Sequence, residues 1–410
     1  MELFLPPQVL KAIGLLEEAG WAAYAVGGCV RDQALGIVPH DYDVCTAASP
    51  GEMKRVFREE RTLETGLKHG TLTVLMDGMP LEITTFRQDG EYRDGRHPDS
   101  VQFTRRVEDD LARRDFTINA MAYSPSRGLV DPFGGREDCA AGVIRCVGQA
   151  EKRFQEDSLR VLRALRFSAR LGFTIEEKTA AALYTEKAGL RRISRERVAA
   201  ELNGLLCAGD AGRVLLAFES IVREAMNAPA GGSWQLAVGR LERVPRDLPL
   251  RWAALLMDSG GENAARQAAE ILKGLKMPSR LTENAELLIR WSAPEYASMP
   301  PAERLMRMGP EGAKQGILLR KADALARAAG ESPAAEQAAA EETEELERLI
   351  RENACFTLRH LAVRGPDLAA LGYKGPDIGK QLNELLLRVV RGQLPNEKEA
   401  LLDAARNINA

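Results

Sequence analysis

The chain has 410 residues, of which 28% are charged, 45% are hydrophobic and 5% are aromatic, and its formal net charge at pH 7 is −3. This length predicts about two to four domains, and the composition is typical of a soluble, helix-rich protein. A net charge so close to zero excludes a chain that binds nucleic acid over its whole surface.

The N-terminal segment and the cysteines exclude further classes of protein. Residues 1–7 have no basic region and no long apolar run follows them, so we expect neither a signal peptide nor a membrane partner and place the protein in the cytoplasm. The six cysteines form no Cys-x-x-Cys pair, and the four histidines show neither zinc spacing nor a metal cluster. We interpret the cysteines as small buried hydrophobes or incidental thiols.

The first elements alternate between helix and strand. Pro6-Pro7, an apolar periodicity and then Gly20 predict an amphipathic helix with proline at its start and glycine beyond its end. Trp21–Val26 is the first predicted strand and Asp41–Cys45 is the second.

Between and within these two strands lie a glycine turn and two carboxylates. Gly27-Gly28 lets backbone N–H groups approach an anion at the start of a helix, and Arg31 adds a charged fork. Asp41 and Asp43, two apart on a strand, point to the same face and repel each other unless a divalent cation such as Mg²⁺ lies between them. Alone, the glycines indicate a turn and the aspartates a surface strand; together they indicate nucleotidyl transfer.

The next segment predicts a helix and a hairpin. Ser49-Pro50-Gly51-Glu52 is a capping box that opens a helix, and Thr71–Met76 and Leu81–Phe86 are strands joined at Asp77-Gly78. Glu82 on the second of these strands either joins the two aspartates as a third carboxylate or is a surface glutamate.

Two polar segments follow the hairpin. Residues 87–99 form a charged, glycine-interrupted loop, which is either ordinary loop composition or a mobile element beside an active site. Arg113–Ala120 has the charged first turn of a helix.

After Gly142 the strand signals largely stop and the pattern is helical, with breaks at Pro300-Pro301 and Gly309-Pro310. The Ala/Glu-rich run 333–347 predicts a long exposed helix. Residues 151–197 contain twelve Lys or Arg and seven Asp or Glu, a local net charge of +5, which indicates a solvated helix face or a basic groove. We predict four domains: a head at 1–142, a neck at 143–207, a body at 208–290 and a tail at 291–410.

A stripe of charged residues marks the predicted neck. On one helix, Asp157, Arg160, Arg163 and Arg166 would form a gradually spiralling row. Solvated Asp–Arg pairing along the helix is the simplest interpretation of this row.

Asp157 and Arg160 also match the edges of two bases. Asp157 only accepts hydrogen bonds and Arg160 only donates them, so together they satisfy the amino group and ring acceptors of cytosine and of adenine. Uracil and guanine would oppose these groups at a cost that corresponds to roughly 10²–10⁴-fold discrimination. Arg163 and Arg166 would then hold the triphosphate or support Arg160.

The glycine turn with Arg31-Asp32 and the run Asp41-x-Asp43-x-x-Thr46 resemble the signature of polymerase-beta-like nucleotidyltransferases. The resemblance is to the branch of class II CCA-adding enzymes (tRNA nucleotidyltransferases) and bacterial poly(A) polymerases. It is strong over residues 8–170 and moderate at Gly372–Lys380, which is otherwise interpreted as a helix-capping loop.

The resemblance implies an α+β multidomain fold, with a small α/β head on a mixed sheet followed by an all-α neck, body and tail. It implies addition of the 3′-terminal CCA to tRNA from CTP and ATP, with pyrophosphate released. RNA rather than DNA is the implied partner, contacted at the tRNA acceptor stem and elbow. An A-adding enzyme, a poly(A) polymerase and a non-catalytic RNA-binding scaffold remain alternatives.

The resemblance also assigns roles to residues. Asp41, Asp43 and Glu82 are the implied catalytic carboxylates, and the two aspartates bind Mg²⁺. The segment 87–99 corresponds to the family's flexible loop, which argues against an enzyme that adds only cytidines. The implied nucleotide-binding residues are Gly28, Arg31, Arg114, Asp157, Arg160, Arg163 and Arg166.

Overall fold

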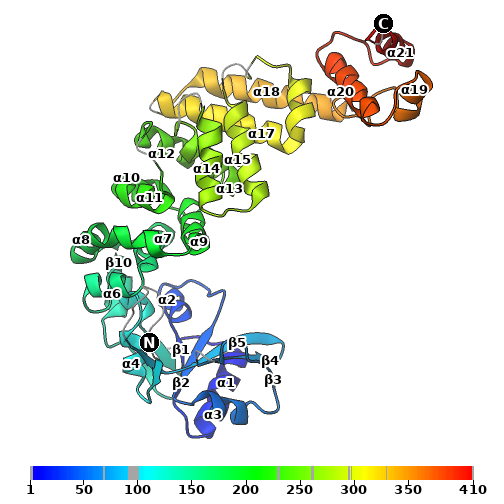
Figure 1. Cartoon of the computed structure of the whole chain (residues 1–410). Coiled ribbons are helices and arrows are strands. Elements are labelled where there is room, and N and C mark those ends of the chain that lie inside the picture. The colour runs from blue at the N-terminus through cyan, green and yellow to red at the C-terminus, as the bar shows by residue number, and fades with distance from the viewer. Residues whose placement is uncertain are drawn as a thin grey trace. The chain divides into compact units, whose positions relative to one another are not determined.

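The structure is a computed structural model of the chain, and it describes residues 3–67, 70–90, 101–228, 231–259, 263–293, 296, 298–328 and 330–408. The chain folds into two compact units, Met1–Asn227 and Ala228–Ala410 (Figure 1). Among the described residues, no helix has both the length and the apolar character needed to cross a lipid bilayer.

The first unit begins with a mixed sheet in the strand order β3-β4-β5-β2-β1-β8-β9. β2 and β5 run parallel, whereas the other neighbouring strands in this sheet are antiparallel. The predicted mixed sheet is thus confirmed. Its strands are β1 (Ala23–Val26), β2 (Asp43–Thr46), β3 (Arg61–Leu63), β4 (Thr71–Met76), β5 (Met79–Thr85), β8 (Ala122–Ser124) and β9 (Gly128–Val130).

The hairpin β4–β5 turns where the sequence predicts it. Asp77 and Gly78 both have positive φ, at 47° and 87°, the backbone that a two-residue turn between twisted strands requires. The second strand starts at Met79, two residues before the predicted start, because Met79 pairs with Met76.

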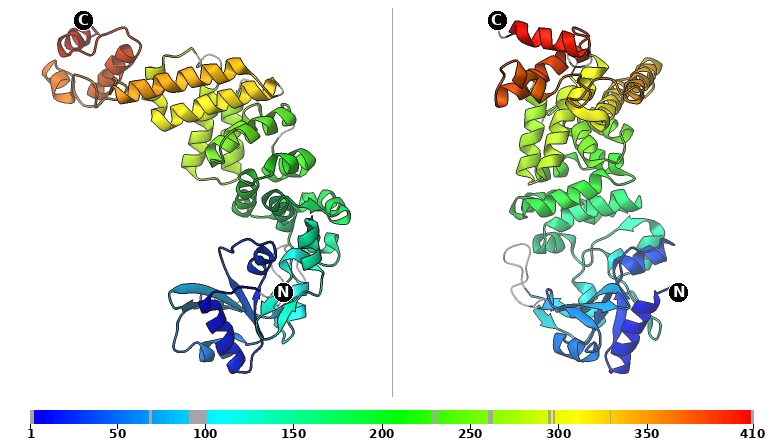
Figure 2. Two further views of the ribbon diagram at one scale, coloured as in Figure 1. Left: turned by 180° about the vertical axis from the view of Figure 1, so that it is seen from behind. Right: turned by 90° about the vertical axis from the view of Figure 1, so that its right-hand side faces the viewer.

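Helices cover both faces of this sheet. α1 (Pro7–Glu18) and α3 (Pro50–Val56) pack together against one face (Figure 2). The predicted capping box opens α3, since the Ser49 N–H donates to the Glu52 carboxylate at 2.6 Å. On the other face, α4 (Val107–Ala112) packs into a core of residues from β1, β2 and the end of β5.

The predicted loop 87–99 is described only in part. Residues 87–89 form β6 (Arg87–Asp89), which pairs with β7 (Val101–Phe103). Residues 91–99 lie outside the described residues.

The rest of the first unit is helical, as predicted, with one addition. β10 (Val143–Ile144) and β11 (Thr174–Ile175) form a short parallel pair. The remaining elements of this unit are α2 (Gly28–Ala34), η2 (Thr117–Asn119), α5 (Gly135–Ala141), α6 (Ala150–Glu156), α7 (Leu159–Leu171), α8 (Glu177–Glu186), η3 (Lys187–Arg192), α9 (Arg195–Leu206), α10 (Ala211–Ala217) and α11 (Glu219–Met226).

The described part of the second unit contains only helices and their connections. α17 is interrupted at Gly309, which has φ 70°, at the predicted Gly-Pro break. α18 is the long exposed helix predicted from the Ala/Glu-rich run, with Leu346 as its buried residue. The helices are α12 (Trp234–Arg243), α13 (Leu248–Leu256), α14 (Ala264–Gly274), α15 (Ser279–Trp291), α17 (Pro301–Arg327), α18 (Pro333–Arg351), α19 (Gly365–Ala370), α20 (Pro376–Val390) and α21 (Lys398–Ile408).

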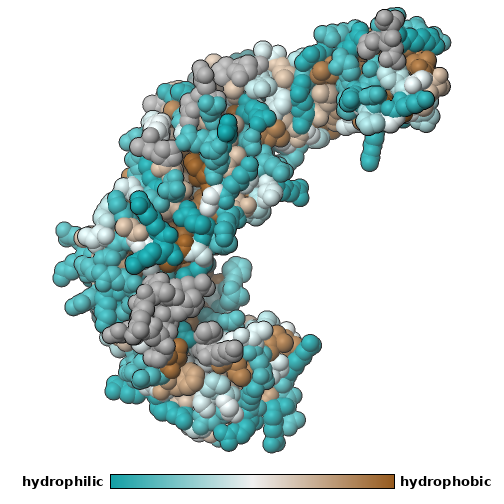
Figure 3. All heavy atoms as spheres, in the orientation of Figure 1, coloured by the Kyte–Doolittle hydropathy of each residue, from teal (hydrophilic) through white to brown (hydrophobic). Residues whose placement is uncertain are grey.

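Each unit has a core of its own. In the second unit, apolar residues of α17, α18, α20 and α21 form one buried cluster. Hydrophilic residues cover most of the face of each unit that Figure 3 shows, with apolar residues in small patches. The predicted boundary at 142/143 falls inside the first unit, and the predicted body at 208–290 spans the junction of the two units; the four-domain division stays a prediction.

Candidate functional site

Two of the three predicted carboxylates lie side by side on the sheet. Asp43 pairs with Glu82 across the parallel strands β2 and β5, so their side chains share a face. The same alternation places Cys45 and Phe86 on this face, which is the face that α4 covers. The register therefore brings together a pair of residues that are 39 positions apart in sequence.

Asp41 lies outside the strand on which it was predicted. β2 begins at Asp43, and Asp41 belongs to the preceding segment, so the predicted alternation along one strand does not apply to the two aspartates. Asp41 is nevertheless close enough for its charge to act on Asp43. Desolvation raises the pKa of Asp43, Arg114 opposes this rise, and the negative charges of Glu82 and Asp41 add to it.

The donor set fits a divalent cation. Three carboxylates that repel one another are oxygen ligands of the kind that hard cations prefer, and a bound cation would relieve the repulsion on Asp43. Among the described residues, no three Asp, Glu, His or Cys side chains converge closely enough to form a complete metal site by themselves. Substrate phosphates supply the remaining ligands in sites of this kind.

Arg114 passes beneath the glycine turn. Gly27 has φ 77°, and a Cβ atom at this position would lie 2.9 Å from Nη1 of Arg114. The glycine is thus required by its backbone conformation and by the close approach of the guanidinium. Nη2 of Arg114 donates to Asp110 at 3.2 Å, while its buried Nε has no hydrogen-bond partner among the described residues. Most buried donors in folded proteins have a partner, so this Nε is an exception near Asp43.

Asp110 holds this arginine in place and was not predicted from the sequence. Its side chain is 1% exposed and accepts hydrogen bonds from Arg113 and Arg114, and from the Arg87 N–H at the start of β6. Burial raises the pKa of Asp110, but Arg114 and Arg113 outweigh burial and hold it below its ordinary value.

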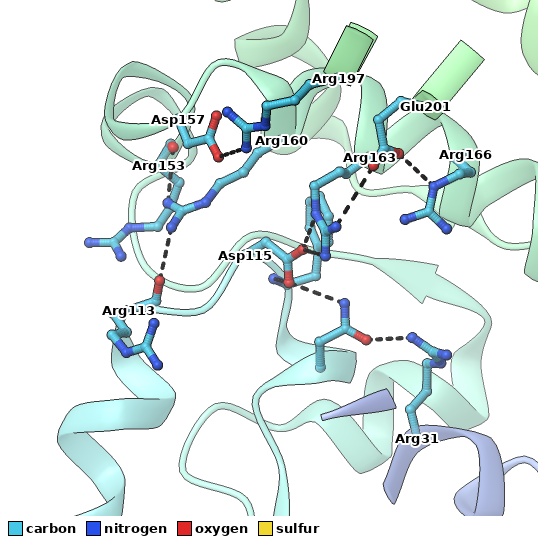
Figure 4. A network of polar contacts seen from close by, with 12 residues as sticks. Arg31, Arg113, Asp115, Arg153, Asp157, Arg160, Arg163, Arg166, Arg197 and Glu201 are labelled. Atoms are coloured by element: carbon cyan, nitrogen blue, oxygen red, sulfur yellow. Dashed lines mark hydrogen bonds and ion pairs between the residues drawn. The ribbon is translucent and has the colours of Figure 1, made fainter. Parts of the chain in front are cut away.

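A chain of hydrogen bonds runs from the glycine-turn helix α2 to the neck (Figure 4). Nη1 of Arg31 donates to Asn119 at 2.6 Å, and Nδ2 of Asn119 donates to Asp115 at 3.1 Å. Arg163 on α7 donates to the other oxygen of Asp115 at 2.8 Å through Nε. Arg31 is buried and also binds Asp32, so internal partners occupy the guanidinium that was predicted to meet an anion.

Asp157 does not lie on the same helix as the arginines, contrary to the prediction of one continuous stripe. α6 ends at Glu156 and α7 begins at Leu159, and Asp157 between them is extended, with φ −141° and ψ 101°. The reason is local: the Asp157 carboxylate accepts the Leu159 N–H at 3.1 Å and so caps the start of α7. Its ion-pair partner is Arg197 on α9, at 2.9 Å.

Hydrogen bonds hold the side chain of Arg160 at the start of α7. It donates to Glu156 at 2.8 Å. It also donates to the carbonyl oxygens of Arg153 and Arg113, both at 3.0 Å (Figure 4). These bonds use three of its five N–H groups. The predicted pair of Asp157 and Arg160 therefore brings one side-chain acceptor and one side-chain donor to the same short segment, where the Arg160 N–H donates to the Asp157 carbonyl oxygen at 3.0 Å and each side chain has other partners.

Glu201 on α9 supports the other two predicted arginines. It accepts from Nε of Arg166 at 2.5 Å and lies 3.8 Å from Nη1 of Arg163. The sequence carried little signal for Glu201 or for Arg197, because both come from a helix more than 30 residues downstream of their partners.

The head sheet and helix α7 are connected through three consecutive residues. Arg114 acts on Asp43, while the Arg113 carbonyl oxygen binds Arg160 and the Asp115 carboxylate binds Arg163. The segment 113–115 is thus shared between the head sheet and α7. All predicted site residues lie in the first unit; the predicted tail segment at Gly372–Lys380 belongs to the second, where α20 begins at Pro376.

Comparisons with known proteins agree with this arrangement. A family model described as "Poly A polymerase head domain" matches residues 23–145, and "tRNA nucleotidyltransferase domain 2" matches residues 247–405. The chain is 36% identical to the CCA-adding enzyme of Lacticaseibacillus paracasei, over 98% of this chain and 95% of the relative. It is 34% identical to that of Geobacillus stearothermophilus, over 97% and 96%.

Solved structures show the same likeness. The crystal structure of the Bacillus stearothermophilus CCA-adding enzyme in complex with CTP matches with a TM-score of 0.78 and 31% identity, covering 99% of this chain and 98% of that one. The Thermotoga maritima CCA-adding enzyme complexed with a tRNA covers all of both chains at 20% identity and a TM-score of 0.63, a likeness of fold. The chain therefore belongs to the family of CCA-adding enzymes, tRNA nucleotidyltransferases with a poly(A) polymerase head domain.

Proposed function

We propose that this chain adds the 3′-terminal CCA to tRNA from CTP and ATP and releases pyrophosphate. The observation that carries the proposal is the shared segment 113–115, which joins the carboxylates of β2 and β5 to the donors and acceptors of α7. Such a site holds a triphosphate at one end and a base edge at the other.

The reaction is an in-line attack of the RNA 3′ hydroxyl on the α-phosphorus. The new oxygen–phosphorus bond forms as the bond to pyrophosphate breaks. Asp41 and Asp43 would hold Mg²⁺, and Glu82, in register with Asp43, would assist with the metal or with the proton of the hydroxyl. Bound there, Mg²⁺ neutralises the triphosphate and makes the hydroxyl a better nucleophile.

The phosphates lie against cationic groups of the head and neck. Gly28 opens α2 beside the carboxylates, and Arg114 is close enough to Asp43 for its positive charge to act on that carboxylate. Arg163 and Arg166, held by Asp115 and Glu201, supply positive charge along α7. Arg31 supports this surface through Asn119.

Base selection follows from Asp157 and Arg160. One accepts and the other donates, so cytosine and adenine pair with them while uracil and guanine oppose them. We place tRNA recognition, at the acceptor stem and elbow, in the helical second unit, and because tRNA is the substrate we expect the enzyme in the cytoplasm. An A-adding enzyme would keep every one of these residues, but the relatives described above are named CCA-adding enzymes.

The test is incorporation into a tRNA that ends at its discriminator base. With Mg²⁺, CTP alone should give two additions, CTP with ATP three, and UTP or GTP none. Asp43→Asn should lower the rate by at least about 10³-fold because one metal ligand loses its charge. The matched control is Asp77→Asn at the exposed hairpin turn, where the rate should not change. Extension by adenosine only, or by a long run of adenosines, would contradict the proposal.

A further inference from the structure

Three guanidinium groups surround one buried aromatic ring. Phe167 on α7 is 5% exposed, and the Cζ atoms of Arg31, Arg163 and Arg166 lie 5.2, 5.3 and 4.4 Å from its ring centroid. The ring meets Phe116 edge to face, with centroids 6.0 Å apart and planes at 81°. Phe167 of α7 therefore contacts Arg31 of α2, the helix after the glycine turn, and Phe116 in the segment between α2 and α7.

The position of Arg166 needs an explanation beyond helix geometry. Neighbouring residues on a helix point to different sides, so Arg166 would not normally lie over the ring next to it. Here Glu201 draws its Nε toward α9, and the side chain folds back over Phe167. The ring provides an attractive face for a cation at this place, whereas an aliphatic side chain of similar volume provides none.

Each of these three cations also has an oxygen partner. Like charges that lie close together repel, and the oxygen partner fixes one end of each guanidinium. These partners are Asp32 and Asn119 for Arg31, Asp115 for Arg163, and Glu201 for Arg166. Each guanidinium is therefore held by two kinds of contact, its oxygen partner and the Phe167 ring.

We infer that Phe167 is a positioning residue for nucleotide binding, which sets the directions of Arg163 and Arg166 and couples them to Arg31. The inference rests on the proposed function, since it gives these arginines a triphosphate to bind. Phe167 itself touches no reacting atom. Loss of the ring should therefore weaken nucleotide binding and leave the saturated rate of addition largely unchanged.

The test compares variants that keep or lose the ring in the full-length chain. Phe167→Leu and Phe167→Met keep apolar volume but lose the aromatic face, and Phe167→Tyr keeps that face. Phe154→Leu is the matched control, because Phe154 is a fully buried ring of α6 that has no guanidinium over its face among the residues that the structure describes. The readouts are the dissociation constant of CTP with Mg²⁺ by titration calorimetry, the saturated rate of tRNA extension, and the melting temperature.

We expect the Leu and Met variants to bind CTP about tenfold more weakly. Phe167→Tyr should bind like the wild type, and Phe154→Leu should lower the melting temperature without changing CTP affinity. Unchanged affinity in both ring-less variants, equal weakening in Phe154→Leu, or no rescue by tyrosine would overturn the inference. Wild-type protein that binds CTP but does not extend tRNA would contradict the proposed function alone, whereas wild-type protein that does not bind CTP would contradict both.

Discussion

The carboxylate of Asp115 connects the segment that follows α4 to helix α7 through its hydrogen bonds. It is 8% exposed, and it accepts hydrogen bonds from Asn119 and from Arg163. Burial alone would raise the pKa of Asp115, but Arg163, Asn119 and Arg160 together hold it at about 2. An ionised, buried carboxylate with these partners stabilises the folded state as long as it keeps its charge.

The lowered pKa predicts a pH-dependent stability. A folded-state pKa of about 2 against an ordinary value of 3.8 corresponds to about 2 kcal/mol, which is present above pH 4 and is lost as the pH falls toward 2. Asp115→Asn should therefore lower the free energy of unfolding at pH 7 and lose this difference in acid. Hydrogen exchange of amides in α7 measures it, with Asp210→Asn, in a half-exposed ion pair with Arg213, as the unaffected control. A constant difference between pH 7 and pH 2.5 would contradict this prediction.

Arg197 fixes the carboxylate of Asp157, the proposed acceptor for a base edge. It binds Asp157 at 2.9 Å, and its buried Nη1 has no hydrogen-bond partner among the described residues. Without this contact, the Asp157 carboxylate can rotate while it still caps α7.

We predict that Arg197→Met increases misincorporation of uridine and guanosine relative to cytidine by about tenfold. The loss of one charge-assisted hydrogen bond to Asp157 is the physical reason. Competition assays with mixed nucleotides measure the ratio directly. Arg191→Met removes an exposed ion pair with Glu224 in the same unit and should leave the ratio unchanged. Equal ratios in the two variants would remove Arg197 from base selection.

At the scale of elements, the contact between α7 and α9 sets the positions of the neck arginines. A Cβ atom on Gly204 of α9 would lie 2.5 Å from Cδ of Arg166. The absence of a side chain at this helical position therefore lets Arg166 reach both Glu201 and Phe167.

Gly204→Ala tests this packing. Alanine is the better helix former by about 1 kcal/mol, so any loss of function must come from the displaced arginine. We predict a several-fold higher KM for CTP and ATP with a melting temperature near that of the wild type. Gly14→Ala in α1, where a Cβ atom has nothing within 4 Å, should raise stability and leave KM unchanged. A normal KM in Gly204→Ala would show that Arg166 does not need the space that the missing side chain of Gly204 leaves.

The elements also show which signals in the sequence were sufficient. The hairpin β4–β5 follows from alternating apolar residues and the Asp77-Gly78 turn, because both signals are local. The break between α6 and α7 was not predicted, although Asp157 and Ser158 are residue types that commonly cap helices. The prediction of one continuous helix rested on the helical spacing of the charged residues, whereas the structure follows the capping signal.

At the scale of the whole chain, the prediction of an α/β head followed by helices is confirmed, since both rest on periodicity and turn residues. The partners of the site residues could not be predicted, because each is set by packing between distant segments. Glu201 and Arg197 come from a helix whose charges look like an ordinary solvated face in the sequence. For Glu82 the pattern left open a place beside Asp43 or a surface position, the family resemblance favoured the first, and the parallel register explains why the two residues are adjacent.

The central claim is that the acidic strand and the segment around Asp157 bind the two ends of one nucleotide. A crystal structure of this chain with CTP and Mg²⁺ tests it most directly. We predict the triphosphate near Asp41, Asp43 and Arg114, with the amino group of cytosine within hydrogen-bond distance of Asp157. A CTP molecule bound at the carboxylates with its base away from Asp157, or bound near Asp157 with its phosphates away from the carboxylates, would contradict the account.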